Sequence, residues 1–425
     1  MSHFVNLREF FVGPVGRIVA APEPVGPGVG ARGRQLFTRL RLWRRANHPR
    51  AERFTWYALK PIAAAALILW FTPFYALVVR RSFGISIREQ ILQQARLAFR
   101  DWVNPRCYYF HEHYRHRGPV DCSSYVMRYE FKEGLLRSLH KLRPKIHGAR
   151  VNLGHKLAFA KVCKQFGLPT PTIAAIARNR RMTVLDRGAL DGDLFLKPEQ
   201  GRGAAGAEAF RRRADGRFAI GDDALSLSDL LESIAAETRR APKLLQPLLT
   251  NHPSIADLAE QSLVTIRIFT AIAPGDRPVV THAMLRVISK LEPNWPSSEE
   301  FAAAIDLATG RLGLMCGDTA IGPQHWYERH PVTNAPITGR IVPQWPAIHA
   351  LALRAQQVFS DRILVGWDVA LTPDGPVLIE GNSYPDTEFL QRVHRQPIGA
   401  SPLGPPLAWH LDQLDALRGR FRADR

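Results

Sequence analysis

A glycine-rich loop that directly follows a short apolar run, LFLKPEQGRGAAG at residues 194–206, restricts the possible folds more than any other stretch. Gly201, Gly203 and Gly206 match the G-x-G-x-x-G pattern of dinucleotide-binding Rossmann folds. In those folds a helix begins at the third glycine, because the pyrophosphate binds to the helix N-terminus. Here three arginines and an Asp215-Gly216 turn signal follow within ten positions of Gly206, which indicates a hairpin. The order strand, loop, strand predicts a flap over phosphates and excludes a Rossmann fold.

Lys197 stands at the end of the strand expected at 193–198, just before this loop. A lysine beside a glycine-rich flap can neutralise nucleotide phosphates as a point charge, while the loop N–H groups donate to the phosphate oxygens. The alternative is a solvent-exposed lysine followed by a glycine linker. This stretch alone does not decide between the two.

The stretch VGWDVALTPDGPVLIEGN, residues 365–382, predicts a hairpin that turns at Pro373-Asp374-Gly375. Asp368 and Glu380 are expected opposite each other on one face, and Asn382 continues that face by the strand period of two. Three oxygen donors at the end of a sheet suit Mg²⁺. Because charges between apolar strand positions are costly unless paired or coordinating, the sequence favours metal ligation over a hairpin with exposed acidic residues.

These stretches follow one another in the order of the ATP-grasp proteins, which the chain resembles over about residues 150–395. The resemblance rests on Lys156 in NLGHKLAFAKVCKQFG, on Lys197, on LLQPLL (244–249), on Arg267 in TIRIFT and on Asp368, Glu380 and Asn382. More narrowly, Q-P-x-L-x-N-H-P (246–253), T-x-R (265–267), H-P-x-T (330–333) and G-W-D-V-A (366–370) resemble the sugar-transfer-associated ATP-grasp group.

The resemblance implies an α+β ATP-grasp fold, in which two α/β subdomains clasp ATP, after a mostly helical N-terminal region with an apolar segment. It implies that Lys156 and Lys197 contact the ATP phosphates under the loop with Gly201, Gly203 and Gly206. Backbone around Gln246 and Leu248 would meet the adenine edge. Asp368, Glu380 and Asn382 would hold one or two Mg²⁺, with Mn²⁺ as a substitute. Arg267 would stabilise the transferring phosphoryl group or the acyl phosphate. For His330 and Thr333, a turn-forming role and a substrate contact both stay open.

The activity that the resemblance implies is a carboxylate–amine ligase that forms an acyl phosphate from a small-molecule carboxylate and then an amide with an amine. A role in cell-surface polysaccharide or sugar-conjugate synthesis follows from the family association. Two alternatives are a kinase-like phosphotransferase and a non-catalytic membrane-bound ATP-binding module.

The N-terminal part carries most of the excess positive charge. Residues 1–100 hold 16 Lys/Arg and 4 Asp/Glu, a net charge of +12, which leaves +7 of the total +19 to the rest. Residues 61–79 are uncharged and apolar, between Lys60 and Arg80-Arg81, and a densely basic segment at 32–50 precedes them. This combination predicts association of residues 32–81 with an anionic membrane surface, at the inner face of the cytoplasmic membrane. Whether residues 61–79 cross the bilayer or insert shallowly stays open, and the alternative to membrane association is a buried helix. No nucleic-acid partner is expected.

The chain divides by pattern into five expected segments. They are a basic N-terminal segment (1–55), an apolar helix (56–84), a helical region (85–149), the ATP-grasp domain (150–400) and a C-terminal tail or helix (401–425). The helical region holds a His-rich stretch with His111, His113 and His116, which is expected to be a surface aromatic and basic patch because acidic or cysteine partners at fixed metal-ligand spacing are lacking. Four scattered cysteines predict neither a zinc site nor disulfides.

Overall fold

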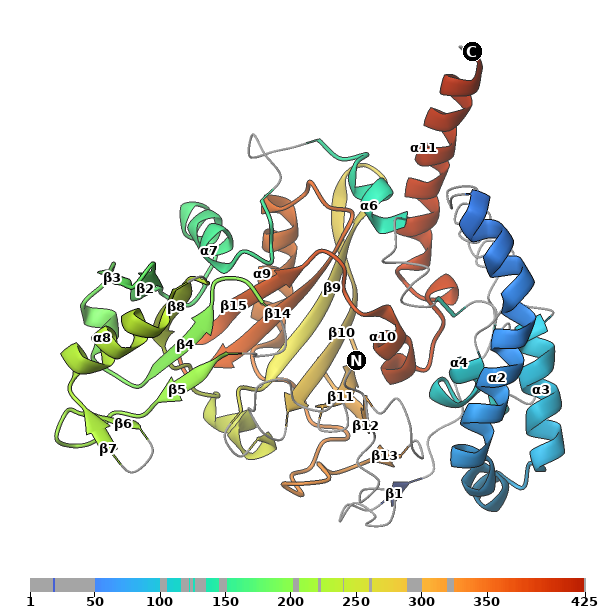
Figure 1. Cartoon of the computed structure of the whole chain (residues 1–425), viewed down its shortest axis with the longest axis horizontal. Coiled ribbons are helices and arrows are strands. Elements are labelled where there is room, and N and C mark those ends of the chain that lie inside the picture. The colour runs from blue at the N-terminus through green and yellow to red at the C-terminus, as the bar shows by residue number, and fades with distance from the viewer. Residues whose placement is uncertain are drawn as a thin grey trace.

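The computed structural model describes residues 18–19, 50–99, 105–115, 122, 125–126, 135–144, 151–201, 206–220, 223–239, 241–259, 262–288, 300–318 and 325–423 (Figure 1). Within them, one sheet has eight strands in the order β1-β13-β12-β11-β10-β9-β14-β15. A smaller sheet has five strands in the order β3-β2-β8-β4-β5, and β6 pairs with β7. With the helices that cover these antiparallel sheets, the fold is α+β, as the sequence predicted.

The strands of the large sheet come almost entirely from the second half of the chain. They are β1 (Ile18–Val19), β9 (Thr265–Ala273), β10 (Arg277–Ile288), β11 (Glu300–Ile305), β12 (Leu312–Gly317), β13 (Trp326–Tyr327), β14 (Leu364–Thr372) and β15 (Gly375–Asn382). The smaller sheets contain β2 (Ala175–Arg178), β3 (Arg181–Val184), β4 (Leu194–Pro198), β5 (Glu208–Phe210), β6 (Phe218–Ile220), β7 (Asp223–Leu225) and β8 (Lys243–Pro247). The strand expected at 193–198 is therefore confirmed as β4.

Helices cover both faces of the large sheet. On one face, α7 (Lys156–Gln165) and α9 (Trp345–Val358) pack on Ile266, Ile268 and Trp367. On the other face, α6 (Leu135–His140), α10 (Thr387–His394) and α11 (Gly404–Ala423) pack on Phe269 and Leu364. The alternation of the strands sends odd and even positions to opposite faces, so every charged strand residue can be assigned a side. The smaller sheet packs on α8 (Leu227–Glu237).

The N-terminal helices stand together at one end of the molecule (Figure 1). They are α2 (Arg50–Phe83), α3 (Ile87–Phe99), α4 (Pro105–Phe110) and the 3-10 turn η2 (His113–Arg115). Their shared core is aromatic, with Tyr75 and Tyr109 stacked at a centroid distance of 4.5 Å. Further 3-10 turns are η4 (Gly188–Leu190), η5 (Pro253–Leu258) and η7 (Ile398–Ala400).

The His-rich stretch corrects one prediction, because it is not a surface patch. His111 and His113 are 6% and 4% exposed, and the ring of His111 lies 4.6 Å from that of Tyr125. The Nε2 atom of His111 lies 3.3 Å from the carbonyl of Glu388 in α10. Aromatic neighbours on α2 and α4 bury this stretch between the N-terminal helices and α10, which its polar composition did not indicate. His116 lies outside the described residues.

Candidate functional site

The hairpin β14–β15 brings two carboxylates face to face. Asp368 pairs with Glu380, and Asn382 pairs with Gly366, so all three predicted oxygen donors lie at one end of this strand pair. The opposing pairs near the turn run from Thr372–Gly375 to Val369–Leu378, and an irregularity of one residue then brings Glu380 opposite Asp368. Without this bulge Asp368 would face an apolar residue, because a one-residue slip sends each side chain to the other face.

Arg267 on β9 holds Asp368 from the other side. The two residues are direct neighbours across the β9–β14 ladder. The Nε and Nη2 atoms of Arg267 donate to the two carboxylate oxygens of Asp368 at 2.6 and 2.5 Å. Both side chains are only 9% exposed. This two-point ion pair fixes the orientation of the guanidinium.

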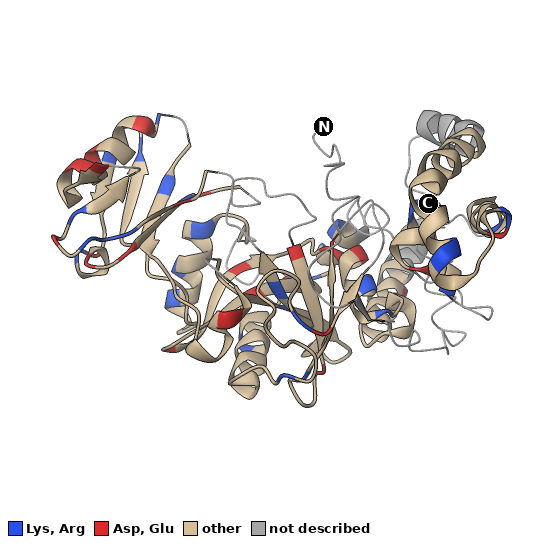
Figure 2. Ribbon diagram, turned by 90° about the horizontal axis from the view of Figure 1, so that it is seen from below, with Lys and Arg blue, Asp and Glu red and all other residues tan. Residues whose placement is uncertain are grey.

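A second arginine, Arg286 on β10, extends the charged row across the sheet. Its Nη1 donates to Asp368 at 3.4 Å, and its Nε donates to Glu300 on β11 at 2.6 Å. Figure 2 shows acidic and basic residues side by side on the strands of the large sheet. The sequence did not reveal Arg286 or Glu300 as site residues. An arginine inside the apolar strand HAMLRVIS is itself a signal of a buried partner, but the partner's identity depends on strand order.

The protonation behaviour of the two facing carboxylates differs. Burial raises the pKa of Asp368, but the guanidinium groups of Arg267 and Arg286 more than offset this, so that the pKa is lowered. Burial and the negative charge of Asp368 raise the pKa of Glu380, against the opposing effect of Arg267 and Lys156. Two carboxylates that share one site repel each other, and a bound cation would relieve that repulsion.

Two lysines approach this carboxylate pair from the smaller sheet and from α7. Lys197 lies on β4, and Lys156 is the first residue of α7. Burial and the ammonium group of Lys156 lower the pKa of Lys197 to about 8, with Glu380 acting in the opposite direction. Burial also lowers the pKa of Lys156, and the charge of Glu380 again opposes this. Lys156, Lys197 and Glu380 are therefore close enough to influence one another where the two sheets meet.

The glycine loop begins next to these lysines. The Nζ atom of Lys156 donates to the carbonyl of Gly201 at 3.3 Å. Gly201 and Gly206 have φ angles of +146° and +72°, which glycine adopts without strain. Gly203 lies outside the described residues. After the loop, β5 returns along β4, so the segment is a strand–loop–strand flap without a helix, as predicted.

A buried glutamate fixes the strand end below the flap. Glu199 is 3% exposed; its side chain accepts hydrogen bonds from Arg178 at 3.2 and 3.3 Å, and one of its oxygens lies 3.6 Å from Nε2 of His155. Its carbonyl accepts the backbone N–H of Lys156 at 3.1 Å. Glu199 thus ties the flap to the start of α7, a role that the sequence did not indicate.

The remaining predicted residues have defined surroundings. Gln246 is buried on β8 and pairs with Phe195, while the N–H of Leu248 donates to the carbonyl of Asp193. An adenine base at this strand would thus have to use backbone groups other than that N–H. Asn382 accepts the N–H of Tyr384 through Oδ1 at 3.0 Å, which leaves one lone pair of that oxygen for a ligand.

His330 is fully buried and forms a turn. Its Nδ1 accepts the backbone N–H groups of Val332 and Thr333 at 3.2 and 3.0 Å. Burial lowers the pKa of His330 to about 4, so the ring is neutral at physiological pH. Of the two open roles, the structure shows the turn-forming one.

The donor set fits a polyanion together with a divalent cation. Lys156, Lys197 and Arg267 supply positive charge, while Asp368 and Glu380 supply hard oxygen ligands that lie too close together to be favourable alone. Among the described residues, no group of three His, Cys, Asp or Glu side chains could hold a metal by itself. A cation here would complete its coordination with Asn382, substrate oxygens and water, as Mg²⁺ commonly does.

The two sheets form an ATP-grasp-like fold. Residues 141–398 match the model of the sugar-transfer associated ATP-grasp family, and the chain belongs to that family. No curated protein sequence matches the chain.

Solved structures with a related fold are distant. The ATP-grasp ligase PsnB, solved with a minimal precursor, Mg and ADP, is 16% identical with a TM-score of 0.31, over 61% of this chain and 59% of PsnB. D-Alanine–D-alanine ligase from Bacillus anthracis is 11% identical with a TM-score of 0.36, over 69% of this chain and 79% of the ligase. Biotin carboxylase from Campylobacter jejuni is 9% identical with a TM-score of 0.37, over 62% of this chain and 46% of the carboxylase. The chain covers less than two thirds of PsnB and of the carboxylase.

Proposed function

We propose that this protein is an ATP- and Mg²⁺-dependent carboxylate–amine ligase. The observation that carries the proposal is the convergence of Lys156, Lys197 and Arg267 on the facing carboxylates Asp368 and Glu380. The structure favours no cysteine nucleophile: all four cysteines are buried, and burial raises the pKa of Cys163 and Cys316 to about 12. Phosphoryl transfer between substrates needs positioning and charge neutralisation rather than a protein nucleophile.

Each charged residue has a task in this proposal. Lys156 and Lys197 neutralise the phosphates of ATP, and the flap N–H groups donate to the phosphate oxygens. Asp368, Glu380 and Asn382 hold Mg²⁺, which neutralises phosphate charge when bound. Arg267, oriented by Asp368, faces the same site and stabilises the negative charge that develops on the phosphoryl group.

The proposed reaction has two transfers. An oxygen of the substrate carboxylate attacks the γ-phosphorus of ATP, the bond from that phosphorus to the β–γ bridging oxygen breaks, and ADP leaves. The amine nitrogen of the second substrate then attacks the carbonyl carbon of the acyl phosphate. Inorganic phosphate leaves, the nitrogen loses a proton, and an amide remains. The family's description supports a sugar-bearing carboxylate or amine and a role in cell-surface polysaccharide or sugar-conjugate synthesis.

The test measures ADP and phosphate release with amino acids, uronic acids and amino sugars, singly and in pairs. We expect release of both products only when a carboxylate and an amine are present together. Glu380→Gln and Lys197→Met should lower the rate at least about a hundredfold, by analogy with the loss of one charge-stabilising group. The matched controls are Glu237→Gln and Lys164→Met, which change exposed residues outside the site and should retain full activity.

Other outcomes identify the alternatives. ADP release without phosphate, with a phosphorylated acceptor that persists, would replace the ligase by a phosphotransferase. Absence of any thermal stabilisation by Mg²⁺ and ATP would indicate a non-catalytic module, because ligand at a hundred times its Kd stabilises by about 2.7 kcal/mol. Full activity of Glu380→Gln would refute the metal assignment.

A further inference from the structure

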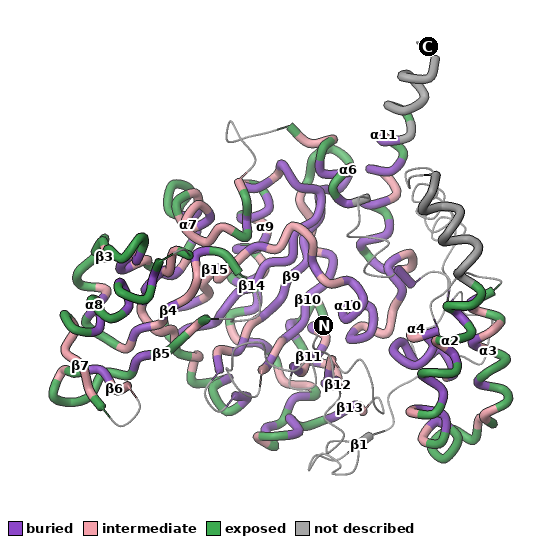
Figure 3. Tube along the Cα trace, in the orientation of Figure 1, coloured by how far each residue is buried: buried purple, intermediate pink, exposed green. Residues whose placement is uncertain are grey.

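The helix α2 presents a continuous apolar face to the outside. Ile62, Leu69, Trp70 and Leu77 are 67%, 73%, 61% and 52% exposed, and they recur at the spacing of one helix face. The other residues exposed between Ile62 and Leu77 are alanine and proline (Ala63, Ala65, Ala66 and Pro73). A helix on the surface of a globular protein normally carries polar residues there, and extended apolar surface indicates an apolar partner. Figure 3 shows the exposed positions along this end of the molecule.

The opposite face of α2 is already occupied by protein. Phe71, Tyr75 and Val79 are buried against the aromatic residues of α4. Gln90 and Gln94 of α3 donate hydrogen bonds to the carbonyl of Ala76 and to the hydroxyl of Thr72, both at 3.1 Å. The helix is thus fixed as a member of a small bundle, with one side packed and one apolar side that no described element covers.

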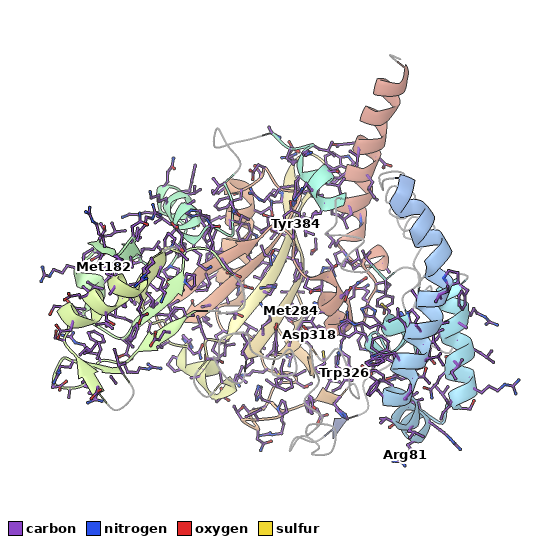
Figure 4. All side chains as sticks on the ribbon, in the orientation of Figure 1. Arg81, Met182, Met284, Asp318, Trp326 and Tyr384 are labelled. Atoms are coloured by element: carbon purple, nitrogen blue, oxygen red, sulfur yellow. The ribbon has the colours of Figure 1, made fainter. Side chains whose placement is uncertain are left out.

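We propose that this face of α2 lies in the plane of a lipid bilayer, with its apolar side chains in the acyl boundary of one leaflet. The charge pattern favours a bilayer over another protein. Arg80 and Arg81 flank the apolar face at its C-terminal end, and the segment before α2 carries the strongly basic sequence RGRQLFTRLRLWRRANHPR. Figure 4 labels Arg81 at this end of the helix. An apolar surface with basic flanks is attracted to anionic lipid both by burial of its apolar side chains and by electrostatics.

The packing of α3 argues against a helix that crosses the membrane. By length and hydropathy, Pro61–Phe83 is the one stretch among the described residues that could cross a bilayer, with a mean hydropathy of 2.2 and 39% of it buried. However, α3 runs antiparallel beside α2, since Gln90 bonds next to Ala76 and Gln94 next to Thr72. On the same alignment, exposed Arg96 lies beside the middle of the apolar stretch. A spanning α2 would place this arginine at the centre of the hydrocarbon, which is costly.

The helix bundle is also tied to the ATP-grasp domain. Arg106 of α4 forms an ion pair with Glu388 of α10 at 3.6 Å, and the guanidinium of Arg392 lies 5.0 Å from the ring centre of Phe110. In-plane insertion keeps these contacts and leaves the whole ATP-grasp domain on one side of the lipid. The inference does not depend on the proposed ligase activity.

Flotation of the purified full chain with lipid vesicles tests the binding face. We expect binding to vesicles of phosphatidylcholine and phosphatidylglycerol, and weaker binding to phosphatidylcholine alone. Leu69→Asp and Leu77→Asp should each lower the bound fraction by roughly tenfold or more, because charge is placed in the acyl region. Leu185→Asp, which changes a leucine that is 54% exposed in the smaller sheet's subdomain, is the matched control and should bind like the unmodified protein. Unchanged binding of the α2 variants would overturn the proposal. So would a lipid-free oligomer that dissociates in Leu69→Asp, since a second copy would then cover the face.

A second experiment separates in-plane insertion from a span. One protease-cleavable tag precedes Met1 and another follows Arg425, and the protein is placed in sealed membrane vesicles. In-plane insertion predicts that added protease removes both tags together or neither of them. Removal of only one tag from intact vesicles would show that the two ends lie on opposite sides, and would refute the in-plane arrangement.

Discussion

Neutral substitutions of the two facing carboxylates should change the stability of the protein to different extents. Asp368 is 6% exposed and accepts two hydrogen bonds from Arg267 and one from Arg286. In Asp368→Asn the guanidinium of Arg267 stays buried without its counter-charge. Removal of one member of a buried ion pair typically costs about 3–5 kcal/mol, so we expect a loss of unfolding free energy of that order. For a domain of this size the melting temperature should fall by roughly 10 °C.

Glu380→Gln should behave differently. Burial and the charge of Asp368 raise the pKa of Glu380, so its ionised form is disfavoured in the folded state. A group whose pKa is raised by folding stabilises the fold at low pH and loses that contribution as the pH rises through the folded-state pKa. Near neutral pH the ionised Glu380 therefore costs stability. Its replacement by glutamine should leave the free energy of unfolding unchanged or slightly increased. Both Asp368→Asn and Glu380→Gln should nevertheless lose the binding of Mg²⁺ and ATP.

Urea or thermal unfolding at pH 7, in the presence of a metal chelator and without nucleotide, measures this contrast. The chelator is needed because a bound cation would stabilise both carboxylates and mask the difference. The pH dependence gives a second test. Asp368 has a lowered pKa, so its contribution is present above the pKa of the unfolded chain and is lost as the pH falls through the folded-state value. Equal destabilisation by the two substitutions would refute the assigned charge asymmetry.

Three further predictions concern single positions. Burial and the charge of Lys156 lower the pKa of Lys197 to about 8, so ATP binding at pH 8–9 should be coupled to the uptake of a proton. Titration calorimetry in buffers of different ionisation enthalpy measures this uptake, which should be absent in Lys197→Met. Gly381→Ala would place a Cβ atom 2.6 Å from Trp367 and 3.0 Å from Leu153, so the free energy of unfolding in urea should fall by about 1–3 kcal/mol. The control Gly192→Ala places its Cβ atom in open space and should change this free energy little. His330→Phe removes the acceptor of two backbone N–H groups and should lower the free energy of unfolding by about 1–3 kcal/mol, while the KM values of the substrates stay unchanged. Altered KM values at unchanged stability would instead indicate that His330 contacts a substrate.

Local patterns predicted the elements that carry the site. The Asp-Gly turn signal and the apolar run at 194–198 correctly indicated a flap without a helix, and the alternation in VALTPDGPVLIEGN indicated the β14–β15 hairpin. The facing of Asp368 and Glu380 was predicted correctly, yet it depends on a bulge for which the sequence holds no evident signal. A regular two-residue hairpin would have placed Ile379 there instead.

Long-range strand order determined what the sequence could not show. Arg267 meets Asp368 across 101 positions because β9 lies between β10 and β14, and Arg286 reaches Glu300 because β11 follows β10 in the sheet. No local pattern encodes these neighbours. The same holds for Met284 and Trp326, which belong to one core cluster and are labelled with Asp318 near α10 in Figure 4. Burial of His111 and His113 was also hidden, since it depends on Tyr125 and, for His111, on α10, which is far away in the chain.

The electrostatics of the site is evidence for its ligand that does not depend on family resemblance. The fold keeps two pairs of like charges close together, Lys156 beside Lys197 and Asp368 beside Glu380. Burial, the larger cause, and the like charge beside each group together leave the pKa of Lys197 lowered and that of Glu380 raised, and the opposite charges nearby do not compensate fully. Stability alone would favour a neutral residue in each pair. A polyanion would supply the opposite charge for the two lysines, and a divalent cation would supply it for the two carboxylates. The same side chains that bind these ligands therefore destabilise the fold when the ligands are absent.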